Sequence, residues 1–557
     1  MLNREKELLI KKTFDDLVNA YLKREDWRVH ENSNQSYGFP SLNNYISSTI
    51  LAKYTLGLYP FEIRRAHEEG TIHIHDLSCG IAGYCSGWSI MDILLQGFAS
   101  SDSSCASAFP PQHFDSACGQ IANFLASMGT EWAGAQAVSS FDTYLAPFVW
   151  NDKLSYEQVK QIVQNFLHEV NNNSKWGQAP FTNISFDMVP SGKLKDSCAV
   201  IGGMVIDKTY GEFQKEIDMI NRAFLELMYQ GDADGKAFPF PIPIYNITKA
   251  FDWDSEMSEL LWKLDAKFGT PNFQNFVSSD LNPDDVRAMC CRLRLDTSQL
   301  HKRTGGLFGA GEKTGSIGVV TLNLPQLAAT SPTQEDFINR VQNYTELACR
   351  SLDFKRRIIT ENLKNGLFPR TSKYLNSFDT YFSTVGVCGM NEAVLNLTNG
   401  AFDIASVFGK TLTENVLDVI NATLVKNQEM MNQMFNLEAT PAESTAYRFA
   451  RVDKKRGLLK HYSGTKKTPY YTNSTQLPAD NELDLWDALE HQEGIQLKYT
   501  SGTIFHVYLG EIVDDWKAVR DLVYNITHNT RIRDFTLTPV FSICPEHGYI
   551  PGKHETC

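Results

Sequence analysis

Short apolar runs rich in β-branched residues recur along this chain of 557 residues, each bounded by glycine, proline or asparagine. Segments with helical spacing of apolar residues lie between them. Runs that are apolar at successive positions suit strands buried on both faces, so they predict a mostly parallel sheet covered by helices. The alternation of strand and helix signals points to either an α/β barrel or a large wound sheet. The runs are 199–206, 238–247, 317–324, 383–390 and 503–510.

Three segments predict helices most clearly: 2–22, 156–170 and 411–432. The second is preceded by Ser155 and has Gln158 three residues later, which predicts a capping box. Elsewhere, prolines interrupt the run 238–247 and, lacking a backbone donor, confine it to a sheet edge or an extended loop. These are Pro239, Pro241 and Pro243.

The chain shows no internal repeat and no long linker, so residues 1–535 are expected to form one large domain. A net charge of −13 argues against a broad basic face for nucleic acid. The N-terminus lacks the apolar core of a signal peptide, and no apolar stretch is long enough for a membrane span. An odd number of cysteines, 11, indicates free thiols in a reducing cytoplasm.

The last stretch, 536–557, changes character and predicts the start of a metal-binding module. Cys544 and His547 form a zinc half-site, because ligands two residues apart can grip one face of a tetrahedron. Cys557 would open the second half, with His554 as a spare. A tail with unpaired thiols is the alternative.

Two positions suggest reactive thiols. Cys290 and Cys291 are adjacent and precede Arg292 and Arg294, which would favour a thiolate and attract an anionic substrate if the segment is a loop. If the segment is a core helix instead, the two cysteines point to different sides and indicate no function. Cys85 is the other position.

Cys85 lies between Gly83 and Gly87, and small neighbours allow a ligand to approach the thiol. A buried cysteine packed beside Trp88 explains this pattern equally well.

Residues 440–444 predict a helix start. Thr440 suits the N-cap, Pro441 the first helical position, and Glu443 completes a capping box, with Ala442 and Ser444 between and after them. A helix start offers free backbone N–H groups and a positive dipole end, which can bind phosphate. An ordinary capped helix is the alternative.

Taken in order, several segments resemble the large subunit of the anaerobic ribonucleoside-triphosphate reductases, a family of glycyl radical enzymes. Their order and spacing, from about residue 40 to the end, carry the resemblance. They are HIHD (73–76), YCSGW (84–88), TEWAGAQA (130–137), SSFDTYLAPF (139–148), QAPFTNISF (178–186), MCCRLRLD (289–296), GVVTLNLP (318–325), TPAES (440–444), YYTNS (470–474) and SICPEHGY (542–549).

The resemblance implies a ten-stranded α/β barrel of two five-stranded halves, with helices outside and a finger loop inside. A cysteine at the loop tip, matched by Cys291, would be oxidised to a thiyl radical and would remove the 3′-hydrogen of the ribose. Cys85 matches the second cysteine, which takes part in the reduction. Asn323 and Met289 match the subgroup that uses formate as reductant.

The resemblance also implies binding partners. Arg292 and the segment 440–444 would hold the ribonucleoside triphosphate, and Gln120 is a candidate contact for a deoxynucleoside triphosphate or ATP effector at a homodimer interface. An iron–sulfur activase that uses S-adenosylmethionine would install the glycyl radical. Zinc would occupy the module at Cys544, His547 and Cys557.

Two departures from the family shape the expectation. The glycyl radical segment does not occur before Cys557, so either the sequence is a fragment or a second polypeptide carries the segment. The chain alone is expected to bind substrate without reducing it. No ATP-cone regulatory domain is recognisable. Two alternatives remain: another glycyl radical enzyme of the formate acetyltransferase kind, and a catalytically silent nucleotide-binding protein.

Overall fold

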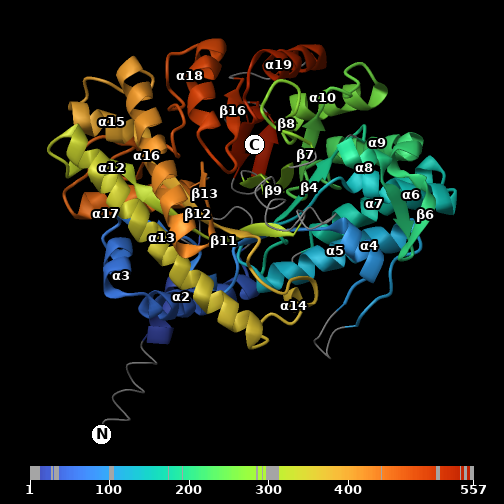
Figure 1. Cartoon of the computed structure of the whole chain (residues 1–557), viewed down its shortest axis with the longest axis horizontal. Coiled ribbons are helices and arrows are strands. Elements are labelled where there is room, and N and C mark those ends of the chain that lie inside the picture. The colour runs from blue at the N-terminus through green and yellow to red at the C-terminus, as the bar shows by residue number, and fades with distance from the viewer. Residues whose placement is uncertain are drawn as a thin grey trace, which may run out of the picture.

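The central feature of the computed structural model is one large mixed sheet (Figure 1). The backbone alone is described for residues 286–290, 293–296, 541–544 and 548–551. The structure describes residues 13–26, 29, 37–99, 106–172, 175–190, 192–283, 286–290, 293–296, 313–440, 442–509, 513, 515–539, 541–544 and 548–551.

Ten strands follow one another across the sheet in the order β13-β12-β11-β2-β3-β4-β7-β8-β17-β16. Neighbouring strands are parallel within the runs β13-β12-β11, β2-β3-β4-β7-β8 and β17-β16. Two antiparallel pairs, β11 with β2 and β17 with β8, join these runs. β1 (Ile72–Ile74) pairs with β11 beside this path. The bounds are β2 Cys85–Trp88, β3 Gln136–Val138, β4 Thr182–Phe186, β7 Ile242–Ile247, β8 Asn272–Asn275, β11 Thr314–Asn323, β12 Tyr381–Cys388, β13 Met434–Glu438, β16 Phe505–Tyr508 and β17 Asp534–Thr538.

The two ends of this path meet. Ser501 N donates to Leu437 O at 2.9 Å, and Ala439 N donates to Gly502 O at 3.1 Å, which ties β13 to the segment leading into β16. The strands therefore enclose an interior, as the expected ten-stranded barrel does.

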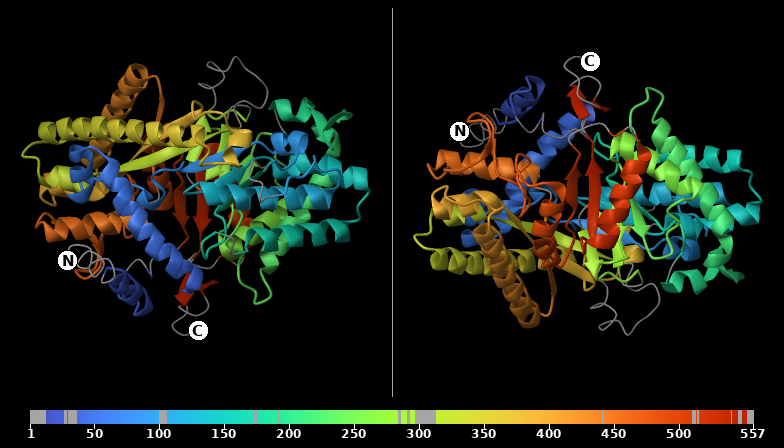
Figure 2. Two further views of the ribbon diagram at one scale, coloured as in Figure 1. Left: turned by 90° about the horizontal axis from the view of Figure 1, so that it is seen from below. Right: turned by 90° about the horizontal axis from the view of Figure 1, so that it is seen from above.

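Helices surround the strands, as the perpendicular views in Figure 2 show. The capping box predicted at Ser155 and Gln158 is present at the start of α7. The helices are α2 Phe39–Leu58, α3 Phe61–Glu68, α4 Ile90–Gln96, α5 Phe114–Glu131, α6 Phe141–Asp152, α7 Tyr156–Val170, α8 Gly192–Asp196, α9 Gln214–Gln230, α10 Glu256–Phe268, α12 Leu324–Ala329, α13 Gln334–Lys364, α14 Thr371–Tyr374, α15 Met390–Thr398, α16 Val407–Met431, α17 Glu443–Lys455, α18 Leu485–Leu497 and α19 Trp516–Asn529; a further helix spans 13–22.

Large aromatic side chains fill the space between the strands and these helices. Trp88, for example, packs against Phe124 and Trp132, and Tyr381 stacks on Trp132 at a centroid distance of 5.4 Å. Side chains alternate between the two faces of a strand, so the neighbours of these aromatic residues point into the barrel.

Two strand predictions are wrong. The run 199–206 forms an antiparallel hairpin of β5 (Cys198–Ile201) and β6 (Met204–Thr209) outside the large sheet, because Gly202 and Gly203, both with positive φ, turn the chain back. The run 238–247 does not lie at an edge. Its strand β7 runs between β4 and β8, with Pro243 second in the strand, where one missing donor is tolerated.

Three further hairpins lie outside the large sheet. They are β9 (Val286–Cys290) with β10 (Leu293–Asp296), β14 (Ser463–Gly464) with β15 (Pro469–Tyr470), and β18 (Phe541–Cys544) with β19 (Gly548–Pro551).

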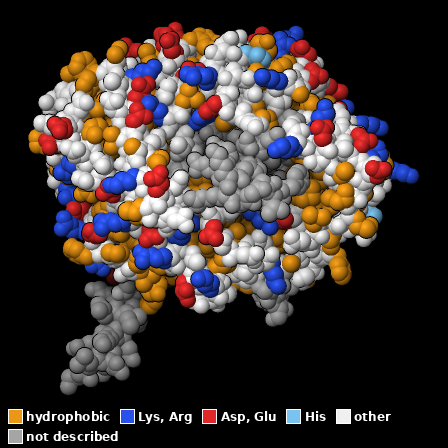
Figure 3. Space-filling model, viewed as in Figure 1, with side chains coloured by type: hydrophobic (Ala, Val, Ile, Leu, Met, Phe, Trp, Pro, Cys, Tyr) orange, Lys and Arg blue, Asp and Glu red, His pale blue; other side chains and the backbone are white. Residues whose placement is uncertain are grey.

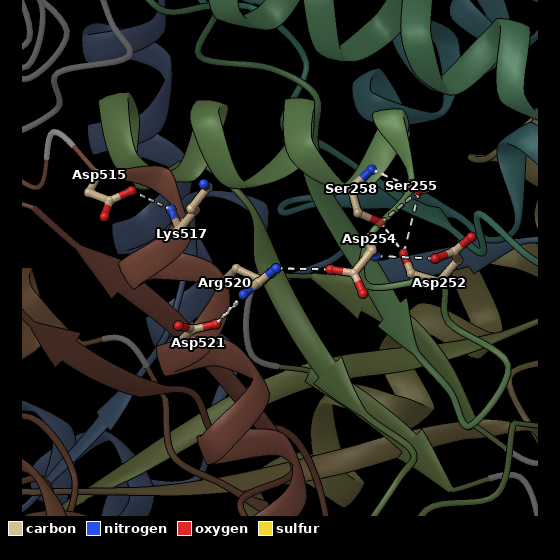
Figure 4. Close-up of polar contacts among 8 residues, drawn as sticks. All are labelled: Asp252, Asp254, Ser255, Ser258, Asp515, Lys517, Arg520 and Asp521. Atoms are coloured by element: carbon tan, nitrogen blue, oxygen red, sulfur yellow. Dashed lines mark hydrogen bonds and ion pairs between the residues drawn. The ribbon is translucent and has the colours of Figure 1, made fainter.

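Helix α19, from the end of the chain, packs against α10 of the other half. Arg520 Nη1 lies 2.9 Å from Asp254 Oδ1, and its Nη2 lies 2.8 Å from Asp521 Oδ1 (Figure 4). This exposed ion pair links the two halves of the barrel near the β8–β17 junction.

The surface is mixed in charge. On the face in Figure 3, lysine and arginine side chains alternate with acidic ones, without a continuous basic stripe. No helix in the described part of the chain is long and apolar enough to cross a membrane.

Candidate active site

The β9–β10 hairpin approaches three strands of the first half. β9 contacts β2, β3 and β4, whose opposite face is covered by helices, so the hairpin lies on their inner side. Cys290 pairs with Leu293, so the two residues between them link the strands. Those residues, Cys291 and Arg292, lie outside the described part of the chain. Met289 lies on β9.

Cys85 lies on the strand next to this hairpin and points into the barrel. It is directly paired with Ser316, which pairs with Phe382, which in turn pairs with Met434. Directly opposite residues project to one face of a sheet, so these side chains form a row across four strands. Cys85, Phe382 and Met434 pack together with Ala135.

A glycine from the next strand segment makes room for this thiol. A Cβ added to Gly134 would lie 2.6 Å from Cys85 Sγ. The alternative that Cys85 packs beside Trp88 is wrong, because Trp88 projects to the outer face and packs against Phe124.

Three buried polar side chains lie on this inner face, and two of them, Asn183 and Asn436, were not singled out from the sequence. Neither polar atom of the Asn183 amide or of the Asn436 amide, nor the Thr440 hydroxyl, has a hydrogen-bond partner within the described structure. Buried amides are normally paired, so unpaired ones inside a barrel indicate a ligand site. Only knowledge of the strand register could have identified the two asparagines.

A buried cation lies near the Cys85 thiol. Lys355 of α13 is buried, its Nζ lacks a hydrogen-bond partner among the residues described, and its stem crosses Gly318, where an added Cβ would lie 2.8 Å from Lys355 Cδ. Burial lowers the pKa of Lys355 to about 8, while Asp76, Cys79 and Cys85 act in the opposite direction. Burial also raises the pKa of Asp76 and of Cys79.

Three histidines form a second buried cluster, at β1. The His73 ring lies 5.3 Å from that of His67 and 4.7 Å from that of His75, and His75 Nε2 lies 2.8 Å from Thr321 Oγ1. Burial lowers the pKa of all three, that of His75 to about 3, and the Arg448 charge adds to the effect. These imidazoles are therefore neutral at physiological pH.

Asn323 ends β11 and uses its amide within the protein. Its Nδ2 donates to Gly70 O at 2.8 Å and to Asp453 Oδ2 at 3.0 Å, and its Oδ1 accepts from Gln326 N at 3.2 Å as the N-cap of α12. These three hydrogen bonds fix the Asn323 side chain between Gly70, α12 and α17. Its predicted contact with substrate or formate stays a prediction.

Helix α17 starts later than predicted. Ala442 is its N-cap, no side chain caps it, and Glu443 is its first residue, so the capping box between Thr440 and Glu443 is wrong. Asn473 instead accepts from Ala442 N at 3.3 Å and fixes the preceding segment. Ser444 lies in the first turn, and Pro441 lies outside the described residues. The first-turn N–H groups are therefore not used by a side-chain cap.

The remaining predicted residues lie apart from this centre. Gln120 is on α5, where its Nε2 donates to Phe109 O at 2.9 Å. Cys544 ends β18 and pairs with Gly548 of β19. His547 and Cys557 lie outside the described part of the chain. No cluster of potential metal ligands occurs among the residues that the structure does describe.

Solved structures that are similar to this chain include anaerobic ribonucleotide reductases. One from Thermotoga maritima, in complex with dATP and CTP, aligns with a TM-score of 0.75 over 96% of this chain and 89% of its own, at 19% identity. Another anaerobic ribonucleotide reductase aligns with a TM-score of 0.77 over 98% of this chain and 86% of its own, also at 19% identity. The likeness establishes the fold.

Sequence comparison identifies the family. The family profile described as "Anaerobic ribonucleoside-triphosphate reductase" matches residues 31–557. Proteins of that name from Haemophilus influenzae and Enterobacteria phage T4 are each 24% identical, over 100% and 93% of this chain and 80% and 86% of their own lengths. The chain belongs to the anaerobic ribonucleoside-triphosphate reductase family, and is thereby an oxidoreductase of deoxyribonucleotide biosynthesis.

Proposed function

We propose that this chain reduces ribonucleoside triphosphates to 2′-deoxyribonucleoside triphosphates by thiyl radical chemistry, with formate as the reductant. One nucleotide, one formate and one proton become one deoxynucleotide, one carbon dioxide and one water. The observation that carries the proposal is the inner-face thiol of Cys85 on β2, the strand that the Cys290–Leu293 hairpin contacts.

Cys291 would carry the reactive sulfur between β9 and β10. A glycyl radical, where it is present, supplies the oxidising equivalent by taking the hydrogen atom of the Cys291 thiol. The resulting sulfur radical would remove the 3′-hydrogen of the ribose, and the 2′-hydroxyl would leave as water. Cys85 would deliver a hydrogen atom to the sugar from the other side, and Met289 would lie beside the reacting centre.

The enclosed barrel supports this chemistry. A sulfur radical needs a site that excludes water and side reactions, and the Cys85 thiol is 4% exposed among Phe382, Met434 and Ala135. The buried Lys355 ammonium interacts electrostatically with Cys85 and would place a positive charge beside the reacting centre.

The substrate phosphates would bind at the start of α17. Its first turn has no side-chain cap, and the helix dipole favours an anion there. Thr440, Pro441, Ala442, Glu443 and Ser444 form this segment, with the unpaired hydroxyl of Thr440 facing the barrel side at Gly386. Arg292 would supply a further positive charge.

Gln120 would contact a deoxynucleoside triphosphate or ATP effector at a homodimer interface in the cytoplasm, and an iron–sulfur activase using S-adenosylmethionine would install the radical. Cys544 ends β18, and it would form the first half of a zinc site together with His547 in a Cys-x2-His pattern. Zinc held there with Cys557 would organise this module.

The test is an anaerobic assay with [14C]formate, the activase, S-adenosylmethionine and a reductant, run with and without a polypeptide that supplies a glycyl radical segment. We expect deoxynucleotide and 14CO2 in equal amounts. Cys85→Ala and Cys291→Ser should abolish both products, whereas Cys198→Ser, at an exposed thiol on β5, should not. Deoxynucleotide formation by Cys291→Ser, or without formate, would contradict the proposal.

A further inference from the structure

A pocket of about 200 Å³ lies at the seam where the two ends of the sheet meet. Its wall includes residues of α16, the end of α18 and the segment before β17, together with Asn436 of β13 and Phe382 of β12. Backbone hydrogen bonds close the seam at Leu437 and Ala439. The pocket therefore occupies the part of the seam next to that closure.

The pocket joins the outside of the molecule to the inner face of the barrel. At its outer side lie Val425, whose side chain is 57% exposed, and the exposed Thr500. At its inner side lie Asn436, 1% exposed, and Phe382, 5% exposed. Phe382 packs against Cys85, so one aromatic side chain separates the pocket from the thiol.

Several polar groups lie in the wall of the pocket. Both polar atoms of the Asn436 amide and the Oδ1 atom of Asn421 lack partners in the described structure. The Arg533 guanidinium lines the same wall, held by Asp280 through Nε at 2.6 Å and by the Tyr499 carbonyl through Nη1 at 2.9 Å. A buried amide without a partner costs free energy, which an occupant that accepts its hydrogen bond would offset.

The size of the pocket limits its occupant. Sites for drug-sized ligands span roughly 300–1,000 Å³, so this pocket is too small for a nucleotide. A molecule of a few non-hydrogen atoms fits. A carboxylate can accept from the Asn436 amide beside the Arg533 charge, while the apolar walls of Phe382 and Leu424 suit a carbon-bound hydrogen.

We propose that the seam pocket admits a small carboxylate, formate, from solvent and holds it at Asn436 on its way to the interior. This inference rests on the proposed formate dependence. No bond changes in the pocket. The nucleotide, which is too large for this route, would reach the barrel elsewhere.

The experiment compares Val425→Trp, which narrows the outer side, and Asn436→Leu, which removes the inner amide, with the unmodified chain. Met430→Trp is the matched control, because Met430 lies on the same helix, is 66% exposed and does not line the pocket. Saturation-transfer NMR with sodium formate measures binding to the chain alone. The anaerobic assay measures KM for formate and for the nucleotide.

We expect weaker formate binding and at least a fivefold rise in KM for formate in both pocket variants. KM for the nucleotide should be unchanged in Val425→Trp, and Met430→Trp should be unaffected. Formate-dependent turnover with identical formate KM and NMR signals in Val425→Trp and Met430→Trp would overturn the inference and leave the proposed function intact. Turnover without formate would overturn the proposed function. The NMR measurement tests the pocket even if turnover does not need formate. Formate binding that neither Val425→Trp nor Asn436→Leu weakens would overturn the seam site.

Discussion

Asn323 Nδ2 donates a hydrogen bond of 3.0 Å to Oδ2 of Asp453, which joins the end of β11 to helix α17. Tyr471 OH donates to the same oxygen at 2.8 Å, and Gln326 Nε2 donates to the other oxygen at 2.5 Å. Burial raises the pKa of Asp453, and these donors oppose that effect. The carboxylate thus holds the helix proposed to bind phosphate against the barrel.

Asn323→Asp should destabilise the protein strongly, because it replaces a donor to Asp453 with a second buried acid. We expect a loss of about 3–5 kcal/mol, as when a buried charge is left unpaired, and about 1–3 kcal/mol for Asn323→Ala. Urea unfolding measures both, with Asn365→Asp at the C-cap of α13 as the control. If Asn323→Asp keeps full stability and loses only turnover, Asn323 acts on the substrate directly.

The neutral histidine cluster predicts acid sensitivity. His67, His73 and His75 have folded pKa values below 6.5, so the unfolded chain binds more protons as pH falls. Their contribution is present above about pH 6.5 and is lost on acidification, by up to about 2 kcal/mol for each imidazole at pH 5. His73→Phe should reduce the difference in unfolding free energy between pH 7 and pH 5, whereas His528→Gln on α19 should not.

Thr440→Val separates a structural from a binding role at the start of α17. The hydroxyl is buried without a partner in the described residues, so removing it should leave stability unchanged or slightly raise it. If it faces the substrate, the dissociation constant for the ribonucleoside triphosphate should rise about five- to tenfold, since a hydrogen bond contributes about 1 kcal/mol. Calorimetric titration and thermal unfolding measure the two effects. An unchanged dissociation constant would remove Thr440 from the site.

Lys355→Met tests the buried cation. The pKa of Lys355 is lowered to about 8 by burial, so the folded protein releases its proton before the unfolded chain does. Stability should therefore rise between about pH 8 and pH 10, by at most about 1.4 kcal/mol for each pH unit. This rise should be smaller in Lys355→Met. Lys364→Met, at the end of the same helix, is the control, and equal pH dependence in all three proteins would contradict the assignment.

The elements of the fold were largely predictable because each strand run is apolar at successive positions. The errors fall at glycine and proline. Gly202 and Gly203 convert one predicted strand into a hairpin, and Pro243 lies inside the sheet because it is near a strand start. Barrel closure depends on pairings at the seam, such as Ser501 with Leu437, which local periodicity does not encode.

The sequence marked two of the inner-face residues, Cys85 by its thiol and Thr440 by its place before a predicted helix. Cys85 was found, but the glycine that contacts it is Gly134, across the sheet, rather than its sequence neighbours. Asn183 and Asn436 were missed because a shift of one residue in register moves a side chain to the other face. The register is irregular between Ser316 and Gly318. Counting alternate residues along the sequence therefore does not tell which face of the sheet a side chain occupies.

The two antiparallel junctions join distant parts of the chain. Ser86 bonds to Tyr381, 295 positions away, and Gln274 bonds to Asp534, 260 positions away. During synthesis on a ribosome, β2 must therefore wait for β11 to emerge, and β8 must wait for β17, close to the end of the chain. Loop closure over such distances makes folding slow, so the nascent half-barrel exposes edge strands at β2 and β8 that a chaperone would need to protect.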